Sequence, residues 1–574
     1  MRRQRRSVKF LCLLFTFVLL AAACSDDDKS DTSAGSSAAP SGEQKKGGTL
    51  LLAAEQWPDC LNPITQCANA SWMHWAVANH VLPRLMELDE EGNFRPSPVL
   101  AGEPTLSGEG TDNGTGAFTL VYEISPDAVW DDGSQMTADD VIHTWNAYLK
   151  TTGSISTAGY DKIEKIEGSN NGKTVTITFT QPYADWQDLF GGNSAYIYQK
   201  SKLSGEDTKD DMNQSYGFSG GPFVLDSFDA TQAVFSPNTA YWDSDRTPFV
   251  DKVIIIPKTD TDTELNAVKA GEVFGIYPQA APGFKEQVAQ DNLTLAFAPG
   301  VSYEAIYMLQ APESNKESVF NDKVVREAFM YAVDRDAILT QIIHPDFPEV
   351  ELLQCGVWVP TVGEWCDQSL WADVTPDPEK VTSLLEGDGW AKGADGIYAK
   401  AGKRLSFKWT VNAGNARREA IQALIIPKLQ DQGIEAVPDN TDADTLFQTR
   451  LPQRQLEVGT YINTASPDPS VTTILHCNQI PTPENSFSGQ NSVGWCNQEA
   501  TALMDESDRT PDPVKRLDLI RQIGKLLRED AVLLPMYQLP NVTIVRNDKV
   551  DGPVTLYTPA AYSAFGNIYD WSLK

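Results

Sequence analysis

The chain has 574 residues and a formal net charge of −32 at pH 7. So acidic a protein is not expected to bind nucleic acid or an anionic lipid surface, because both attract basic patches. A chain of this length exceeds what one hydrophobic core organises, so the sequence predicts at least two lobes.

The first 23 residues have the pattern of a secretory signal peptide. Five basic residues among the first nine precede a largely apolar run at 10–23, which is too short to span a membrane. The sequence AAAC that ends at Cys24 is similar to a lipobox, in which the chain is cleaved before the cysteine and the cysteine is acylated. An ordinary signal peptide with an incidental cysteine is the alternative. We expect an exported lipoprotein anchored through Cys24 to the outer face of the cytoplasmic membrane, in the cell envelope or periplasmic space.

Residues 25–47 contain no aromatic and no branched aliphatic side chain. Such a segment cannot bury enough apolar surface to offset the conformational entropy that it loses on ordering. We therefore expect residues 24–47 to form a lipidated, disordered tether with a reach of about 25 Å. No later run of the chain approaches the ~18 apolar residues of a membrane-spanning helix, so no further span is expected.

Two elements are predicted at the start of the globular body. The apolar residues 48–53 predict a strand, and residues 68–87 have a helical pattern that ends at Pro83. His74 and His80 are six positions apart and lie on different faces of that helix. They therefore do not form the i, i+4 pair of a helical metal site, and no metal is expected.

Residues 118–149 predict a strand, a turn and a helix. The segment 118–124 has apolar side chains at every second position, which is typical of a strand with one buried face. Gly133 can adopt the positive φ of the turn that follows. Thr137 and Asp140 then have the spacing of a capping box, and apolar residues on one face indicate a helix that extends to Leu149.

Further along the chain, the same two periodicities indicate more elements. Alternating segments predict strands at 173–179 and 301–309, and 535–537 is expected to be a strand near the C-terminus. Amphipathic patterns predict helices at 415–429 and 514–527.

Eight cysteines are present. One of them, Cys12, lies in the signal peptide, and Cys24 is the expected lipidation site. Six cysteines allow fifteen pairings, but an oxidising compartment and short separations favour three local disulfides. A metal site is the alternative, although no C-x-x-C is present. The expected disulfides join Cys60 with Cys67, Cys355 with Cys366, and Cys477 with Cys496.

The stretch WDDGSQMTADDV at 130–141 resembles the W-x-D-G-x-x-x-T-A-x-D-V signature of the family 5 extracellular solute-binding proteins, the peptide and nickel class that serves ABC importers. This resemblance extends over nearly the whole chain after the tether. Further blocks similar to those of the family follow in order at 221–223, 238–242, 252–257, 325–335 and 377–390.

The resemblance implies an α/β fold, namely the two-lobed periplasmic-binding-protein type II fold in its large form with an extra domain. Ligand would be held in a cleft between the lobes and buried by hinge closure. The domains expected on this basis are a discontinuous first-lobe core at 48–90, 219–300 and 540–574, an extra domain at 91–218, and a second lobe at 301–539.

The function implied by the resemblance is that of an extracytoplasmic substrate-binding lipoprotein of an ABC importer. It would capture oligo- or dipeptides and deliver them to permease subunits that work with a cytoplasmic ATPase. The protein would be a monomer, with no cofactor and no catalytic residue. A sensor lipoprotein with the same fold is an alternative.

The segment expected to recognise the ligand departs from the family pattern. In the family's peptide binders an acid in G-W-x-x-D-x-x-D-P pairs with the amino group of the peptide, and Ala465 stands at that position here. A buried cation without its counter-charge is costly, so either another acid serves, such as Asp468, or the ligand lacks a free amine, as an oligosaccharide does. The expected ligand contacts are Tyr461, Asn463, Thr464, Tyr303, Trp358 and Trp57.

An enzyme is not expected, because the chain contains no G-x-S-x-G, H-E-x-x-H or P-loop motif and no G-x-G-x-x-G followed by an acid at ribose spacing. A glycosidase pair of acids has no sequence signature, and it stays open as a further alternative.

Overall fold

The computed structural model describes residues 44–89, 92–113, 115–192, 194–551 and 565–574. The expected signal peptide 1–23, the lipidation site Cys24 and most of the tether 24–47 lie outside these ranges. Among the helices in the described ranges, none is long and apolar enough to cross a membrane.

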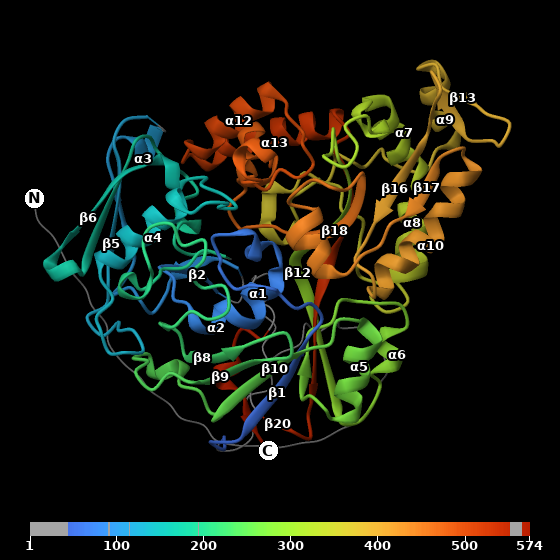
Figure 1. The fold of residues 1–574 in the computed structure, drawn as a ribbon. Helices are drawn as coiled ribbons and strands as arrows, with labels where there is room; N and C mark the ends of the chain where they lie inside the picture. Colours follow the sequence, from blue (N-terminus) through green and yellow to red (C-terminus); the bar gives the residue numbers. More distant parts are fainter. Residues whose placement is uncertain (1–43, 90–91, 114, 193, 552–564) are drawn as a thin grey trace, which may run out of the picture. The chain divides into compact units, whose positions relative to one another are not determined.

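A mixed sheet of ten strands forms the centre of the fold, in the order β17-β16-β18-β12-β19-β11-β1-β10-β9-β8. Its neighbouring strands come from distant parts of the chain; β1, for example, pairs in parallel with β10 (Figure 1). The strands are β1 (Thr49–Ala54), β8 (Phe223–Phe228), β9 (Ala233–Pro237), β10 (Lys252–Pro257), β11 (Gly275–Ile276), β12 (Leu293–Met308), β16 (Ser406–Thr410), β17 (Glu435–Pro438), β18 (Val458–Thr464) and β19 (Leu533–Arg546).

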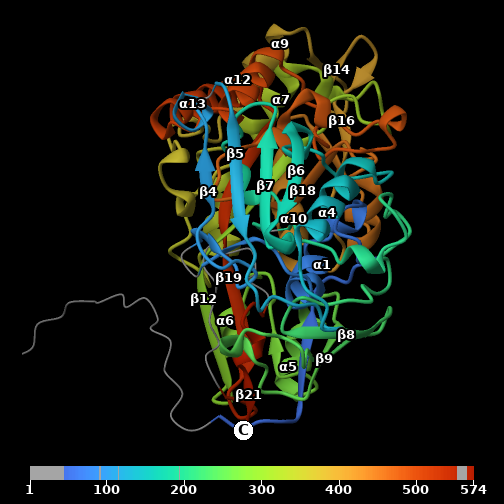
Figure 2. The ribbon, with the colours of Figure 1, turned by 90° about the vertical axis from the view of Figure 1, so that its left-hand side faces the viewer.

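The two longest strands, β12 and β19, run antiparallel beside each other (Figure 2). Both are longer than the segments predicted from the sequence. In β12, Pro299 and Gly300 interrupt the alternation that would have revealed the first half of the strand. The ladder absorbs this interruption as a register shift between Pro299 and Tyr303. This irregularity lies where the sequence places the boundary between the lobes.

A second sheet of four antiparallel strands has the order β4-β5-β7-β6 (Figure 2). The strands are β4 (Thr105–Ser107), β5 (Phe118–Glu123), β7 (Thr174–Phe179) and β6 (Ile163–Ser169). Helix α4 (Ala138–Lys150) contacts β6 and β7. Its predicted capping box is present, since the Thr137 amide donates to Asp140 Oδ2 at 3.0 Å. Gly133 adopts φ +80° in the preceding turn, which confirms the strand, turn and helix predicted for this stretch.

The helices predicted at 415–429 and 514–527 are present as α10 and α13. The helical segment before Pro83 ends at Val81, and α10 contains Pro427 within the helix. The helices are α1 (Ser71–Met73), α2 (Asn79–Val81), α3 (Gly110–Asn113), α5 (Thr261–Ala270), α6 (Phe284–Gln287), α7 (Lys323–Ala332), α8 (Arg335–Ile338), α9 (Pro378–Gly387), α10 (Ala416–Asp431), α11 (Thr472–Leu475), α12 (Gln498–Asp508) and α13 (Pro513–Glu529). The short strands are β2 (Met86–Leu88), β3 (Phe94–Pro96), β13 (Ala391–Lys392), β14 (Tyr398–Lys400), β15 (Lys403–Arg404), β20 (Val550–Asp551) and β21 (Ser572–Leu573).

Buried apolar side chains gather in two clusters. The first includes Trp72 and Tyr122, and the second includes Phe329 and Trp409. Ile462 of β18 packs against both clusters, so this strand lies where the two cores meet. Two cores accord with the two lobes that the chain length predicted. The exact domain boundaries given above stay a proposal.

Cysteine pairing in the structure is the pairing expected from the sequence. Cα–Cα separations of 5.3, 5.1 and 4.7 Å lie within the usual range for disulfides. The bonds join Cys60 with Cys67, Cys355 with Cys366, and Cys477 with Cys496.

A fully buried ion network joins β12 to α10. Glu304 accepts from Arg417 at 2.5 Å and from Arg418 at 2.8 Å, and all three side chains are 0% exposed. Arg417 also donates to the carbonyl of Ala280 at 2.9 Å. Glu304 accepts hydrogen bonds from both arginines, and the charge of the buried Glu55 acts on Arg417 as well. These negative charges offset the cost of burying two cations in a low-dielectric interior.

Candidate ligand-binding site

A cavity of about 380 Å³ lies between the two apolar clusters. Strands β12 and β18 and the loop after β18 form one wall, and α1 with the segment 183–195 contributes to the other. The two walls touch beside the cavity, since the Gly489 amide donates to the Ile155 carbonyl at 3.0 Å. Its size is at the lower end of the range of about 300–1,000 Å³ that is usual for small-molecule sites.

Five of the six expected contact residues line this cavity: Tyr303, Trp358, Tyr461, Asn463 and Thr464. Two of them, Tyr461 and Asn463, are joined through Tyr307. The ring of Tyr461 stacks on Tyr307 with a centroid separation of 4.1 Å, and Asn463 Nδ2 donates to the hydroxyl of Tyr307 at 2.9 Å. Tyr303 lies opposite Asn463 in the β12–β18 ladder. The wall at β18 is therefore aromatic and held in place by its own contacts.

Trp358 and Thr464 complete this wall. The Trp358 indole donates to the Pro469 carbonyl at 3.0 Å, and the Thr464 hydroxyl lies 3.3 Å from that of Ser302. These hydrogen bonds satisfy the polar atoms that burial would otherwise leave unpaired.

The sixth expected residue, Trp57, is not among the residues that line the cavity. Its ring stacks on Phe228 at 5.4 Å, and its indole donates to the Asp229 carbonyl at 2.9 Å. Both the apolar face and the polar atom of Trp57 are thus used in packing.

Acidic side chains also line the cavity, and of these only Asp468 was singled out from the sequence. We refer to Asp185, Asp188, Asp468 and Asp508 as the acidic cluster; the first three line the cavity. Arg516 of α13 binds both oxygens of Asp468, at 2.5 and 2.6 Å. Asp468, which was the substitute suggested for the acid missing at Ala465, is thus already paired.

Asp508 is also satisfied by its neighbours, because it accepts from the hydroxyls of Ser470 at 2.8 Å and Thr472 at 2.6 Å. Asp188 Oδ2 accepts from the Ser466 hydroxyl at 2.7 Å. Burial raises the pKa of Asp188 and of Asp508 to about 6.

Asp185 is the least satisfied member of the acidic cluster. Its Oδ2 accepts from the Tyr183 hydroxyl at 3.3 Å, whereas its Oδ1 is buried without a hydrogen-bond partner among the described residues. Burial, with the charges of Asp468 and Asp188, raises the pKa of Asp185 well above its usual range. The sequence around it, PYADWQD, matches no site motif, so only the tertiary structure reveals its position.

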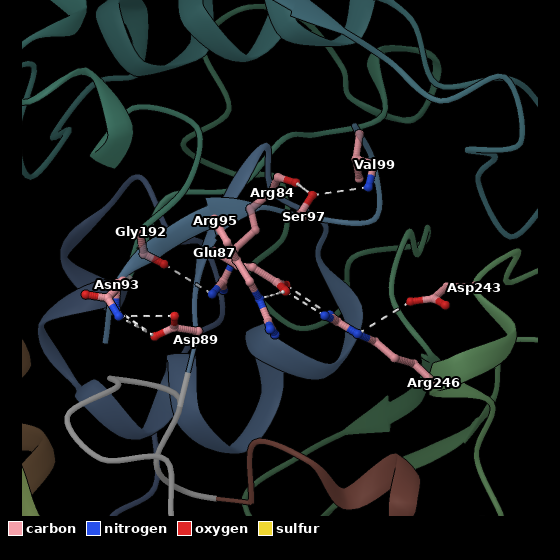
Figure 3. A network of polar contacts seen from close by, with 10 residues as sticks. All are labelled: Arg84, Glu87, Asp89, Asn93, Arg95, Ser97, Val99, Gly192, Asp243 and Arg246. Atoms are coloured by element: carbon pink, nitrogen blue, oxygen red, sulfur yellow. Dashed lines mark hydrogen bonds and ion pairs between the residues drawn. The ribbon is translucent and has the colours of Figure 1, made fainter. Parts of the chain in front are cut away.

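The segment that carries these acids is fixed to the polar network in Figure 3. In that network Arg84 donates to the Gly192 carbonyl at 3.2 Å, and Glu87 pairs with Arg246 at 2.5 Å (Figure 3). Gly192 has φ +60°, and a Cβ built there would lie 1.9 Å from Asp188 Oδ1. Only glycine fits at this position with the Asp188 carboxylate where it is.

Residues 96–481 match the family model of the bacterial extracellular solute-binding proteins, family 5 (Middle). The chain is a family 5 extracellular solute-binding protein. It is 22% identical over 460 residues to the oligopeptide-binding protein OppA of Mycobacterium tuberculosis, an alignment that covers 79% of this chain and 74% of OppA.

Two solved structures show the same fold. The oligopeptide-binding protein AppA of Bacillus subtilis, in complex with a nonapeptide, superposes with a TM-score of 0.79 at 21% identity, over 93% of this chain and 100% of AppA. The periplasmic EDTA-binding protein EppA superposes with a TM-score of 0.78 at 21% identity, over 93% of this chain and 98% of EppA. The fold is thus the two-lobed periplasmic-binding-protein fold, as expected. Family 5 solute-binding proteins carry substrates and are not enzymes.

In this solute-binding protein the acidic cluster lies next to the position that lacks the family's acid. Ser466, the hydrogen-bond donor to Asp188, directly follows Ala465 in the chain. Asp188 reaches this point from the opposite wall of the cavity.

Proposed function

We propose that this solute-binding protein captures oligo- or dipeptides in the cavity between its lobes and delivers them to the permease of an ABC importer. The observation that carries the proposal is the cavity itself, which has an aromatic wall at β18 and lies between two separate cores. OppA is an oligopeptide-binding protein and AppA binds a nonapeptide, which supports a peptide as the substrate class here.

Within this proposal, the ligand contacts on the second lobe are Tyr303, Trp358, Tyr461, Asn463 and Thr464. Aromatic rings would cover apolar side chains of a peptide, while the hydroxyl and amide groups would bond its polar atoms. A combination of aromatic side chains with placed polar groups is usual for ligand-binding pockets.

The proposal also includes the setting of the protein. The signal peptide and Cys24 would place it on the outer face of the cytoplasmic membrane as a lipid-anchored monomer. From there it would meet the permease subunits, whose cytoplasmic ATPase drives transport. Two acyl chains or more make such an anchor stable.

Binding would act by population shift. An open form admits the ligand, contacts from both lobes favour the closed form, and the closed form docks on the permease. The hinge is the paired β12 and β19, with its irregularity between Pro299 and Tyr303. Small-angle scattering should show compaction when a tightly bound peptide is added, and an unchanged radius of gyration would count against this mechanism.

The proposed substrate is tested by mass spectrometry of the small molecules released when the purified chain 48–574 is denatured. Recovered peptides are the expected result. Recovered glycans or other compounds without an amino group would overturn the peptide assignment while leaving the fold and family unaffected.

A further inference from the structure

The four carboxyl groups of the acidic cluster outnumber the cations that lie beside them. In the described part of the chain, Arg516 is the cation that acts on Asp185, Asp188 and Asp508 as well as on Asp468. Its guanidinium is committed to Asp468 through two hydrogen bonds. One cation among four carboxyl groups leaves a deficit of positive charge beside the cavity.

Two of these carboxyl groups are placed to receive a further cation. Asp508 is buried and accepts two hydroxyl hydrogen bonds, but Asp185 and Asp188 line the cavity and are only partly buried. Asp185 Oδ1 has no partner in the described structure. Burial and the neighbouring acids raise the pKa of Asp185 and favour its protonated form, whereas an ammonium in the cavity would favour the ionised form.

We propose that Asp185 and Asp188 form the subsite that binds an ammonium group of the ligand, in place of the carboxylate that is absent at Ala465. This inference rests on the proposed peptide-binding function and adds to it the group that recognises the peptide's charge. The acid is supplied from the wall opposite β18, so that a bound ammonium would join both walls of the cavity.

An ammonium group fits this subsite better than a metal ion. Among the residues that the structure describes, no group of three or more His, Cys, Asp and Glu side chains is arranged to hold a metal. An ammonium carries three N–H donors, and the Asp185 and Asp188 carboxylates offer acceptors from two directions. Charge-assisted hydrogen bonds of this kind are about twice as strong as neutral ones.

The subsite is also held in a fixed position before ligand arrives. The Leu85 amide donates to the Phe190 carbonyl at 2.8 Å, and the Phe190 amide donates to the Tyr160 hydroxyl at 3.0 Å. With the bond from Arg84 to Gly192, these contacts fix the backbone on the C-terminal side of Asp188. Little ordering is then needed when the ligand binds.

The test uses protein produced from the full-length chain and freed of bound ligand by unfolding and refolding. A tryptic digest of casein is offered first, and the peptide captured best is identified by mass spectrometry. This peptide is then synthesised in its free form and in a form acetylated at every amino group. Isothermal titration calorimetry measures both forms against the wild type, the double variant Asp185→Asn with Asp188→Asn, and the control Asp210→Asn at an exposed site.

Acetylation should weaken binding to the wild type and to the Asp210→Asn control by about 10- to 100-fold, the value expected for a hydrogen bond to a charged group. The double variant should bind both forms alike, with the affinity of the wild type for the acetylated form. That retained binding also shows that the variant is folded. Equal binding of both forms by the wild type, or a double variant that still prefers the free amine, would overturn the inference and leave the proposed function intact. Failure to capture any peptide would overturn both.

Discussion

Replacing Arg516 should disturb the acidic cluster beside the cavity, because this residue holds Asp468. Arg516 and Asp468 are 7% and 11% exposed, and two hydrogen bonds of 2.5 and 2.6 Å join them. In Arg516→Gln, Asp468 loses its cation while three other acids remain nearby. Removing one partner of a buried ion pair costs about 3–5 kcal/mol. For a chain of this length, that corresponds to a fall in melting temperature of about 3–5 °C.

The pH dependence of the stability lost in Arg516→Gln distinguishes a charge effect from a packing effect. Because the pKa of Asp188 and of Asp508 is raised to about 6, the folded protein takes up protons that the unfolded chain binds only near pH 4. Stability from these groups is therefore greatest at low pH and is lost as pH rises through about 6.

Thermal unfolding followed by circular dichroism at about pH 8 and about pH 5 measures this effect. The difference between Arg516→Gln and the wild type should be larger at the higher pH, where the acidic cluster is ionised. The matched control is Lys515→Gln, whose side chain on the same helix is 71% exposed, and it should change the melting temperature little at either pH. A loss in Arg516→Gln that is equal at both values, or greater at the lower one, would refute the electrostatic reasoning.

Three other changes test separate parts of the structure. Glu304→Gln removes the carboxylate that hydrogen-bonds two buried arginines and should lower the free energy of unfolding by about 3–5 kcal/mol in urea denaturation; an unaltered midpoint would contradict this. Affinity for a free-amine peptide should fall as pH drops below about 6, because burial raises the pKa of Asp188 to about 6 and protonated Asp188 cannot pair with an ammonium. The fall should be at most about tenfold per pH unit for each carboxyl that must ionise. Calorimetry that finds constant affinity would argue against the subsite. Gly192→Ala should weaken peptide binding by displacing Asp188, whereas Gly205→Ala, where the added Cβ meets nothing within 4 Å, should bind as the wild type does; equal affinities would show that Asp188 is not needed.

Elements specified by neighbouring residues were predictable from the sequence. The strand, turn and capped helix at 118–150 depend on alternation, one glycine and one capping box, and all of these lie within a few residues of the element that they define. The first half of β12 was not predicted, because Pro299 and Gly300 break the pattern and the strand exists through its pairing with β19. The family resemblance supplied the arrangement of the lobes, which local patterns do not contain.

The cavity was predictable only on the side that resembles the family. Tyr461, Asn463 and Thr464 are consecutive or nearly so on β18, and the resemblance located them. Asp188 lies far from Ser466 in the sequence, so their hydrogen bond follows from tertiary packing alone. The stacking of Trp57 on Phe228 likewise joins distant parts of the chain, and the sequence did not reveal it.

A crystal structure of the protein with a peptide recovered from it would show whether a peptide occupies the cavity with an amino group at the acidic cluster. We expect an amino nitrogen within about 3 Å of a carboxylate oxygen of Asp185 or Asp188. The peptide should also contact Tyr461 and Trp358 on the other wall. A peptide bound outside the cavity, or one whose amino groups all face solvent, would contradict this expectation.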